Sequence, residues 1–334
     1  MMFPSSSLLN ATLALLTSSP WLADDHASIQ VPSITIGQDV FGLDVTMPLI
    51  GAGTWQYNDT IAYDSVCKAF SAGYTFVDTA LGYKNQQGVG KALADCWFAK
   101  GRSRDALFIM TKIPGGMSAS ETLEAHYENL HLLGLDYVDH VMTHFPADWK
   151  VTPERSSKEQ RQEEWMGLEN LYYQGLTRSI GMSHYCPQHI DDVLEIATVG
   201  PSINQVEYHV GSGDIDHVIQ KCRENKIHFM SFSPLCGPCD LKDPSDSLIN
   251  GALVSDIAKK YGPHVTGSQV ALRYIVQQAL EEDSYIAGVI PKSNNVEHIK
   301  SNAKIFDFEL SEDDMIRLMS ASEPSAEDGD CDVP

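Results

Sequence analysis

The sequence predicts an α/β protein in which eight parallel strands close into a (β/α)8 TIM barrel, preceded by an N-terminal β-hairpin. Short apolar runs of strand length alternate along the chain with amphipathic helical stretches, which is typical of right-handed βαβ units. Eight such runs fit a closed barrel. Polar side chains follow several of these runs, at the barrel end where active sites lie. No Pro-rich or Ser/Gly-rich stretch divides the 334 residues.

Each element has its own pattern. The expected strands lie at 50–54, 75–78, 107–112, 138–144, 179–183, 203–207, 228–232 and 286–290. The expected helices include 65–71, 121–133, 163–174, 189–196, 215–224, 268–280 and 311–320. Residues 34–45 alternate apolar and polar side chains around Gly42, which predicts the hairpin.

Four of the polar side chains form a candidate acid–base site. Asp78 ends one strand and Tyr83 lies in the loop beyond it, while Lys112 and His144 end the next two strands. A free tyrosine has a pKa near about 10, and a neighbouring Lys ammonium lowers that pKa by favouring the phenolate. The aspartate would hold the lysine in place, and the histidine would supply a second hydrogen-bond donor. Taken singly, each has an ordinary structural explanation, but together they predict catalysis.

Composition excludes several classes of function. The net charge of −22 repels phosphate backbones, so we expect no nucleic-acid partner. No apolar run is long enough to cross a bilayer. Seven scattered cysteines predict no disulfide framework and a reducing, cytoplasmic location. The apolar stretch 8–16 leaves open a secretory or organellar signal within residues 1–27.

The expected organisation is an N-terminal extension (1–30), a barrel (31–320) and a solvated acidic tail (321–334), as a monomer. Asn294 is expected to cap a helix, with Glu297 completing a capping box. The Cys236–Cys239 pair has the spacing of a redox motif and could form a loop disulfide. No metal site is expected, because His140 and His144 would lie about 13 Å apart along a strand.

Several motifs resemble those of the aldo-keto reductases, over about residues 34–318. Residues 47–55 (MPLIGAGTW) resemble the family's opening segment, and 73–80 with Tyr83 and Asn85 resemble its catalytic signature. Residues 143–146, 175–183, 204–209, 233–235 and 290–293 follow in family order.

The resemblance implies NADPH-dependent reduction of an aldehyde or ketone, with NADH as a weaker alternative cofactor. Tyr83 would donate the proton, Lys112 and Asp78 would adjust the pKa of Tyr83, and His144 would orient the substrate. Trp55 and Phe145 would line the substrate pocket. The implied cofactor residues are Thr54, Ser183, His184, Gln205, Phe232, Ser233, Leu235, Lys292, Ser293, Asn294, His298 and Asn302.

The chain departs from the family pattern at several of these positions. His298 stands where arginine is usual, which predicts weaker or pH-dependent NADPH preference. His184 replaces an asparagine, and Phe232 replaces a tyrosine that stacks on the nicotinamide. The short tail predicts an open, permissive pocket.

Two alternative functions stay open. A non-catalytic NADPH-binding sensor or regulatory subunit of the same fold need not keep all four catalytic residues. A barrel glycosidase would need a pair of acids, of which Glu207 is one candidate without a convincing partner.

Overall fold

The computed structural model describes residues 31–147, 157–237, 241–281, 283–326 and 331. Eight parallel strands form one sheet in the order β10-β9-β8-β7-β6-β5-β4-β3. They are β3 (Ala52–Gly53), β4 (Phe76–Asp78), β5 (Phe108–Ile113), β6 (His140–Thr143), β7 (Ile180–Ser183), β8 (Ile203–Glu207), β9 (His228–Phe232) and β10 (Ile286–Val289). The predicted barrel is confirmed.

Backbone hydrogen bonds join the two ends of the sheet. The Gly51 N–H donates to the Val289 carbonyl at 2.9 Å, and the Val289 N–H donates to the Leu49 carbonyl at 3.0 Å. These bonds leave neither terminal strand as a free edge at this point.

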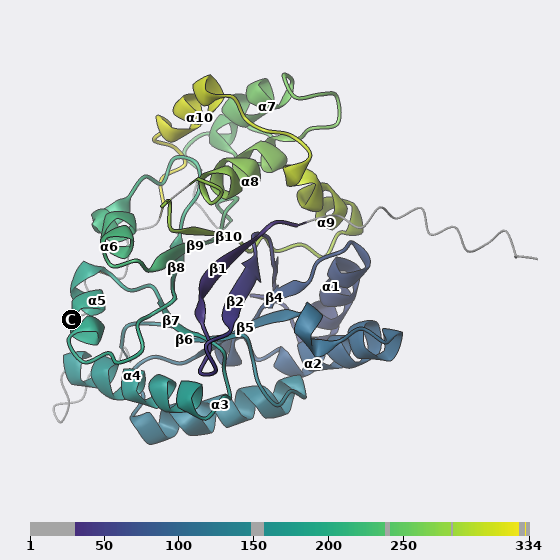
Figure 1. Ribbon diagram of the computed structural model, residues 1–334. Coiled ribbons are helices and arrows are strands. Elements are labelled where there is room, and N and C mark those ends of the chain that lie inside the picture. The colour runs from purple at the N-terminus through teal and green to yellow at the C-terminus, as the bar shows by residue number, and fades with distance from the viewer. Residues whose placement is uncertain (1–30, 148–156, 238–240, 282, 327–330, 332–334) are drawn as a thin grey trace, which may run out of the picture.

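Helices surround the barrel (Figure 1). They are α1 (Asp59–Ser71), α2 (Gln86–Ala92), α3 (Ala119–Leu133), α4 (Ser157–Tyr173), α5 (Pro187–Leu194), α6 (Val218–Glu224), α7 (Ala252–Ala258), α8 (Gly267–Gln278), α9 (Val296–Ala303) and α10 (Glu312–Met319). The local sequence determines where several of these helices begin and end. Ser118 and Glu121 form a capping box at the start of α3, and Gly134 ends that helix at φ +67°.

The predicted hairpin is also confirmed. Strands β1 (Ser33–Gln38) and β2 (Asp44–Pro48) pair antiparallel and lie across one end of the barrel (Figure 1). Val45 and Met47 are fully buried and pack with Phe76 and Phe108 in the barrel interior. Each such side chain contributes about 1.5–3 kcal/mol when removed from water. The hairpin therefore closes the barrel at the end opposite the strand C-termini.

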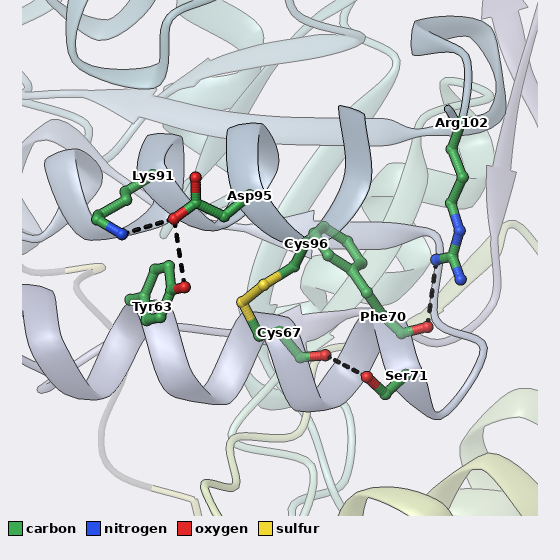
Figure 2. Close-up of a disulfide and its surroundings, with 8 residues drawn as sticks. All are labelled: Tyr63, Cys67, Phe70, Ser71, Lys91, Asp95, Cys96 and Arg102. Atoms are coloured by element: carbon green, nitrogen blue, oxygen red, sulfur yellow. Dashed lines mark hydrogen bonds and ion pairs between the residues drawn. A yellow bond between two sulfur atoms is a disulfide. The ribbon is translucent and has the colours of Figure 1, made fainter. Parts of the chain in front are cut away.

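The prediction that the cysteines form no disulfides is wrong. Cys67 of α1 bonds to Cys96, which lies in the π-helix η2 (Leu93–Trp97) that continues α2 (Figure 2). Cys186 bonds to Cys331, Cys236 is also disulfide-bonded, and Cys222 is a buried free thiol. In each of the two identified pairs the Cα atoms lie 5.4 Å apart, a separation created by folding. The inference of a reducing compartment loses its basis.

The acidic tail also differs from the expectation of a wholly solvated end, because Cys331 is bonded to the barrel through Cys186. Cys239 and residues 1–30, which contain the candidate signal, lie outside the described residues. Within the described part of the chain, no helix is long and apolar enough to cross a membrane.

Candidate active site

Lys112 connects the predicted catalytic side chains. Its Nζ lies 2.6 and 2.8 Å from the two carboxylate oxygens of Asp78 and 3.1 Å from the Tyr83 hydroxyl. The lysine is only 1 % exposed, so these partners stand in for water around its charge. Burial disfavours the ammonium, but Asp78 and Tyr83 outweigh that effect and raise the Lys112 pKa. The side chain is therefore a fixed cation beside a phenol.

The parallel strands bring this group together. Asp78 ends β4, Lys112 lies near the end of β5, and Tyr83 ends the 3-10 helix η1 (Leu81–Tyr83) that follows β4. Gln205 on β8 reaches across the barrel interior, and its Nε2 donates to Asp78 Oδ2 at 3.2 Å. The Thr54 hydroxyl donates to the Asp78 carbonyl at 2.9 Å. Asp78 is thus fixed through both its side chain and its backbone.

Burial raises the pKa of the Tyr83 phenol above its ordinary value of 10, although the charge of Lys112 acts in the opposite direction. The sequence suggested a lowered pKa because it shows the lysine but not the depth of burial. A phenol with a raised pKa keeps its proton at neutral pH. The Tyr83 hydroxyl therefore keeps a hydrogen that it can donate to a group in the cavity.

His144 follows β6 and faces the same space. Its ring centroid lies 5.4 Å from that of Tyr83. Burial, the Lys112 charge and His184 lower the His144 pKa to about 2, so the imidazole is neutral. A neutral imidazole can donate one N–H to a substrate oxygen without carrying charge. His144 also stacks on Phe145, with centroids 4.6 Å apart.

A cavity of about 720 Å³ opens in front of these side chains, a size typical of ligand sites. Most predicted site residues lie on its wall: Asp78, Tyr83, His144, Trp55, Phe145, Ser183, His184, Gln205, Phe232, Ser233, Leu235 and Lys292. The His184 ring lies between those of Phe145 and Phe232, 4.8 Å from each. The deeper part of the cavity is therefore largely aromatic.

Lys292 supplies a positive charge on the cavity wall. Its Nζ donates to Gln56 Oε1 at 2.6 Å and lies over the rings of Trp55 and Tyr57. No carboxylate pairs with it among the described residues. Partial burial lowers the Lys292 pKa, which shows that its charge is incompletely solvated. Such a cation suits an anionic ligand group.

Five other predicted cofactor residues are not on the cavity wall. Thr54 is buried beneath it, and Asn302 is 6 % exposed within α9. Ser293, Asn294 and His298 lie around the start of α9.

The predicted helix cap is wrong by one residue. Asn295 is the N-cap of α9, and its side chain accepts from the Glu297 and His298 N–H groups. The backbone carbonyl of Asn294 instead accepts a hydrogen bond from Lys68 Nζ at 2.9 Å.

The sequence analysis missed one part of the cavity wall. Cys186, Cys331, Asp214, Ile215 and Asp216 all line it. The sulfurs of Cys186 and Cys331 and a carboxylate oxygen of Asp216 lie within 4.8 Å of one another, but both sulfurs belong to the disulfide. No sequence signal identified this group, because its members are up to 145 residues apart.

Comparisons with known proteins agree with this geometry. The aldo/keto reductase family model matches residues 49–323. A glyoxal reductase of Bacillus subtilis is 33% identical over 281 residues, covering 82% of this chain and 88% of the relative. A solved aldo-keto reductase, MGS-M4 from a deep-sea metagenome, has a TM-score of 0.74 at 30% identity, covering 91% of this chain and 100% of that one.

A Bombyx mori aldo-keto reductase solved in complex with NADP has a TM-score of 0.71 at 28% identity, covering 87% of this chain and 92% of that one. The family model spans most of the barrel, and the matched structures share its fold. The protein belongs to the aldo/keto reductase family, whose members are oxidoreductases that act on small carbonyl compounds.

Proposed function

We propose that this protein reduces an aldehyde or ketone to an alcohol with NADPH, using Tyr83 as the proton donor. The observation that carries the proposal is the chain of contacts from Asp78 through Lys112 to the Tyr83 hydroxyl, because Asp78, Tyr83 and His144 line one cavity. Bound NADPH would supply the hydride to the carbonyl carbon.

The protein side chains act on the carbonyl oxygen. The neutral His144 donates an N–H to it and fixes its orientation. Tyr83 gives its proton as negative charge develops on that oxygen, and the Lys112 ammonium stabilises the phenolate that remains. Asp78 keeps Lys112 in position throughout.

Lys292 on the cavity wall and the start of α9, which follows it in the chain, support a site for a dinucleotide phosphate. Lys292 carries an incompletely solvated charge, and Ser293, Asn294 and His298 lie around the positive N-terminal end of α9. The Bombyx mori relative binds NADP. We expect NADH to bind more weakly, with His298 giving a smaller preference for the extra phosphate than arginine would.

Three aromatic residues suggest the substrate class. Trp55, Phe145 and Phe232 line the cavity, and Phe145 stacks on His144, so an aromatic or apolar carbonyl compound is favoured. Because one chain supplies all these groups, the proposal requires only a monomer. The net charge of −22 disfavours a nucleic-acid substrate.

The first experiment is NADPH consumption by the purified protein with a reactive aromatic aldehyde, beside Tyr83→Phe. The variant keeps the ring but loses the proton, so we expect kcat to fall at least about 100-fold while NADPH affinity is retained. NADPH fluorescence titration supplies the control for binding. Tight NADPH binding without turnover by the wild type would instead indicate the non-catalytic sensor.

A further inference from the structure

The bond between Cys186 and Cys331, here called the tail disulfide, lies on the wall of the candidate active-site cavity. Cys186 is the N-cap of α5, three residues beyond the end of β7. Cys331 comes 145 residues later in the chain. The catalytic scheme gives neither sulfur a role, although both contribute to the surface that a substrate would meet.

The barrel side of the tail disulfide is firmly fixed. Cys186 is only 3 % exposed, and its N–H donates to His189 Nδ1 at 3.2 Å. The preceding Tyr185 carbonyl accepts from Asn204 Nδ2 at 2.8 Å, which connects this segment to β8. Cys186 is therefore a rigid point at the end of the barrel that carries the active site.

The described part of the tail also packs at this end of the barrel. A side-chain carbon at Gly211 would lie 2.6 Å from the carbonyl oxygens of Glu323 and Pro324, so the tail backbone packs directly on that glycine. Lys242 forms an ion pair with Glu323 at 2.6 Å. At residue 331, the Gln188 side chain donates to the Cys331 carbonyl at 2.9 Å beside the disulfide.

A third segment completes this part of the wall. Asp216 belongs to the 3-10 helix η5 (Ile215–His217), and its carboxylate reaches within 4.8 Å of both sulfurs. Asp216 and Ile215 also line the cavity. The tail disulfide thus lies between the start of α5 and η5 on the cavity wall. The expectation that a short tail leaves the pocket open does not hold at this position.

We propose that the tail disulfide is a specificity-determining wall of the substrate cavity, and that its reduction widens the cavity. A dithiol would reduce the bond to two thiols, Cys186 and Cys331 each gaining one proton and one electron, as the dithiol closes to its own disulfide. Among the described residues, the Gln188 side chain would still donate to the Cys331 carbonyl. The oxidised enzyme favours compact carbonyl substrates, and the reduced enzyme accepts bulkier ones.

This inference rests on the proposed carbonyl reduction, so the test compares two substrates in one enzyme. We would measure kcat/KM for benzaldehyde and for a bulky naphthyl ketone in the wild type and in Cys331→Ser. The variant should raise the ratio of bulky to compact substrate at least about fivefold, equivalent to about 1 kcal/mol of discrimination. Dithiothreitol should produce the same change in the wild type and no further change in the variant.

The bond between Cys67 and Cys96 provides the matched control. It joins α1 to η2 (Figure 2), and neither cysteine lines the cavity. Cys96→Ser also loses a disulfide and exposes a thiol, but it should leave the substrate ratio unchanged. Intact-mass measurement after alkylation would establish which bond each protein contains.

An unchanged ratio in Cys331→Ser, with loss of the bond verified, would overturn the inference. A change of equal size in Cys96→Ser would do the same, because it would indicate general loosening. Absence of any carbonyl turnover in the wild type would refute the proposed function instead. Fluorescence titration with a naphthalene-based probe would then decide the inference, which requires tighter binding to Cys331→Ser than to the wild type.

Discussion

Tyr83 experiences two opposing effects whose balance decides its chemical role. Removal from water raises the pKa of its hydroxyl, whereas the Lys112 ammonium at 3.1 Å favours the phenolate. Burial dominates in this structure, so the phenol is protonated at neutral pH. The same surroundings give His144 a pKa of about 2, so it does not gain charge at any pH where the protein would be assayed.

This balance predicts the pH profile. The kcat for carbonyl reduction should be level at neutral and mildly alkaline pH, because burial raises the pKa of Tyr83 above its ordinary value and the phenol keeps its proton there. The rate of alcohol oxidation, which needs the phenolate, should rise as the pH increases. Initial rates at saturating NADPH would check both profiles. An acidic limb near pH 6 that disappears in His144→Gln would contradict the neutral role given to His144.

At the scale of single elements, the start of α9 shows that a local sequence pattern can place a helix cap to within one residue. The sequence indicated an asparagine cap but placed it at Asn294, because two asparagines stand side by side. The structure gives the role to Asn295, whose Oδ1 accepts from Glu297 at 2.9 Å. The choice depends on where the backbone leaves β10, which is a property of the barrel.

The two asparagines therefore form a matched pair of variants. Asn295→Ala removes the capping oxygen and should lower the free energy of unfolding by about 1 kcal/mol. Asn294→Ala should leave stability almost unchanged, since only its backbone carbonyl accepts, from Lys68. Urea unfolding followed by circular dichroism would measure both. Equal losses in the two variants would show that the cap is not the source of the stability.

The strands, and the placement of the candidate catalytic side chains at the strand ends, were predictable because each depends on a local apolar run and the polar residues after it. Helix α2 was not, since Gly88 and Gly90 lower its helix propensity. The structure gives the reason for these glycines. A side-chain carbon would lie 2.1 Å from the Asp59 carbonyl at Gly88 and 2.4 Å from the Leu132 carbonyl at Gly90. The tail disulfide was equally invisible, because pairing depends on packing between distant segments.

At the scale of the whole molecule, the disulfides connect regions that the barrel alone would leave independent. One joins α1 to η2, and the tail disulfide joins α5 to the C-terminal segment. Disulfides persist in oxidising compartments, so cysteine usage does not support a reducing compartment for this protein.

The loss of stability on removing a disulfide should increase with the number of residues in the loop that the bond closes. With a separation of 29 residues, loss of the bond in Cys67→Ser should cost about 3–4 kcal/mol. With 145 residues, loss of the tail disulfide in Cys331→Ser should cost up to about 5 kcal/mol. Urea midpoints with and without dithiothreitol would measure these losses. Identical midpoints for oxidised and reduced wild-type protein would contradict the prediction.

The closure of the barrel by Leu49, Gly51 and Val289 has a consequence for the order of events during synthesis. A growing chain cannot complete the sheet until β10 has been translated, so β3 waits with an unpaired edge through most of translation. Cys96 follows Cys67 early, whereas Cys222, Cys236 and Cys239 are all synthesised after Cys186 and before its partner, Cys331. Native pairing of Cys186 is thus a late step that depends on the nascent barrel keeping those earlier thiols away from it.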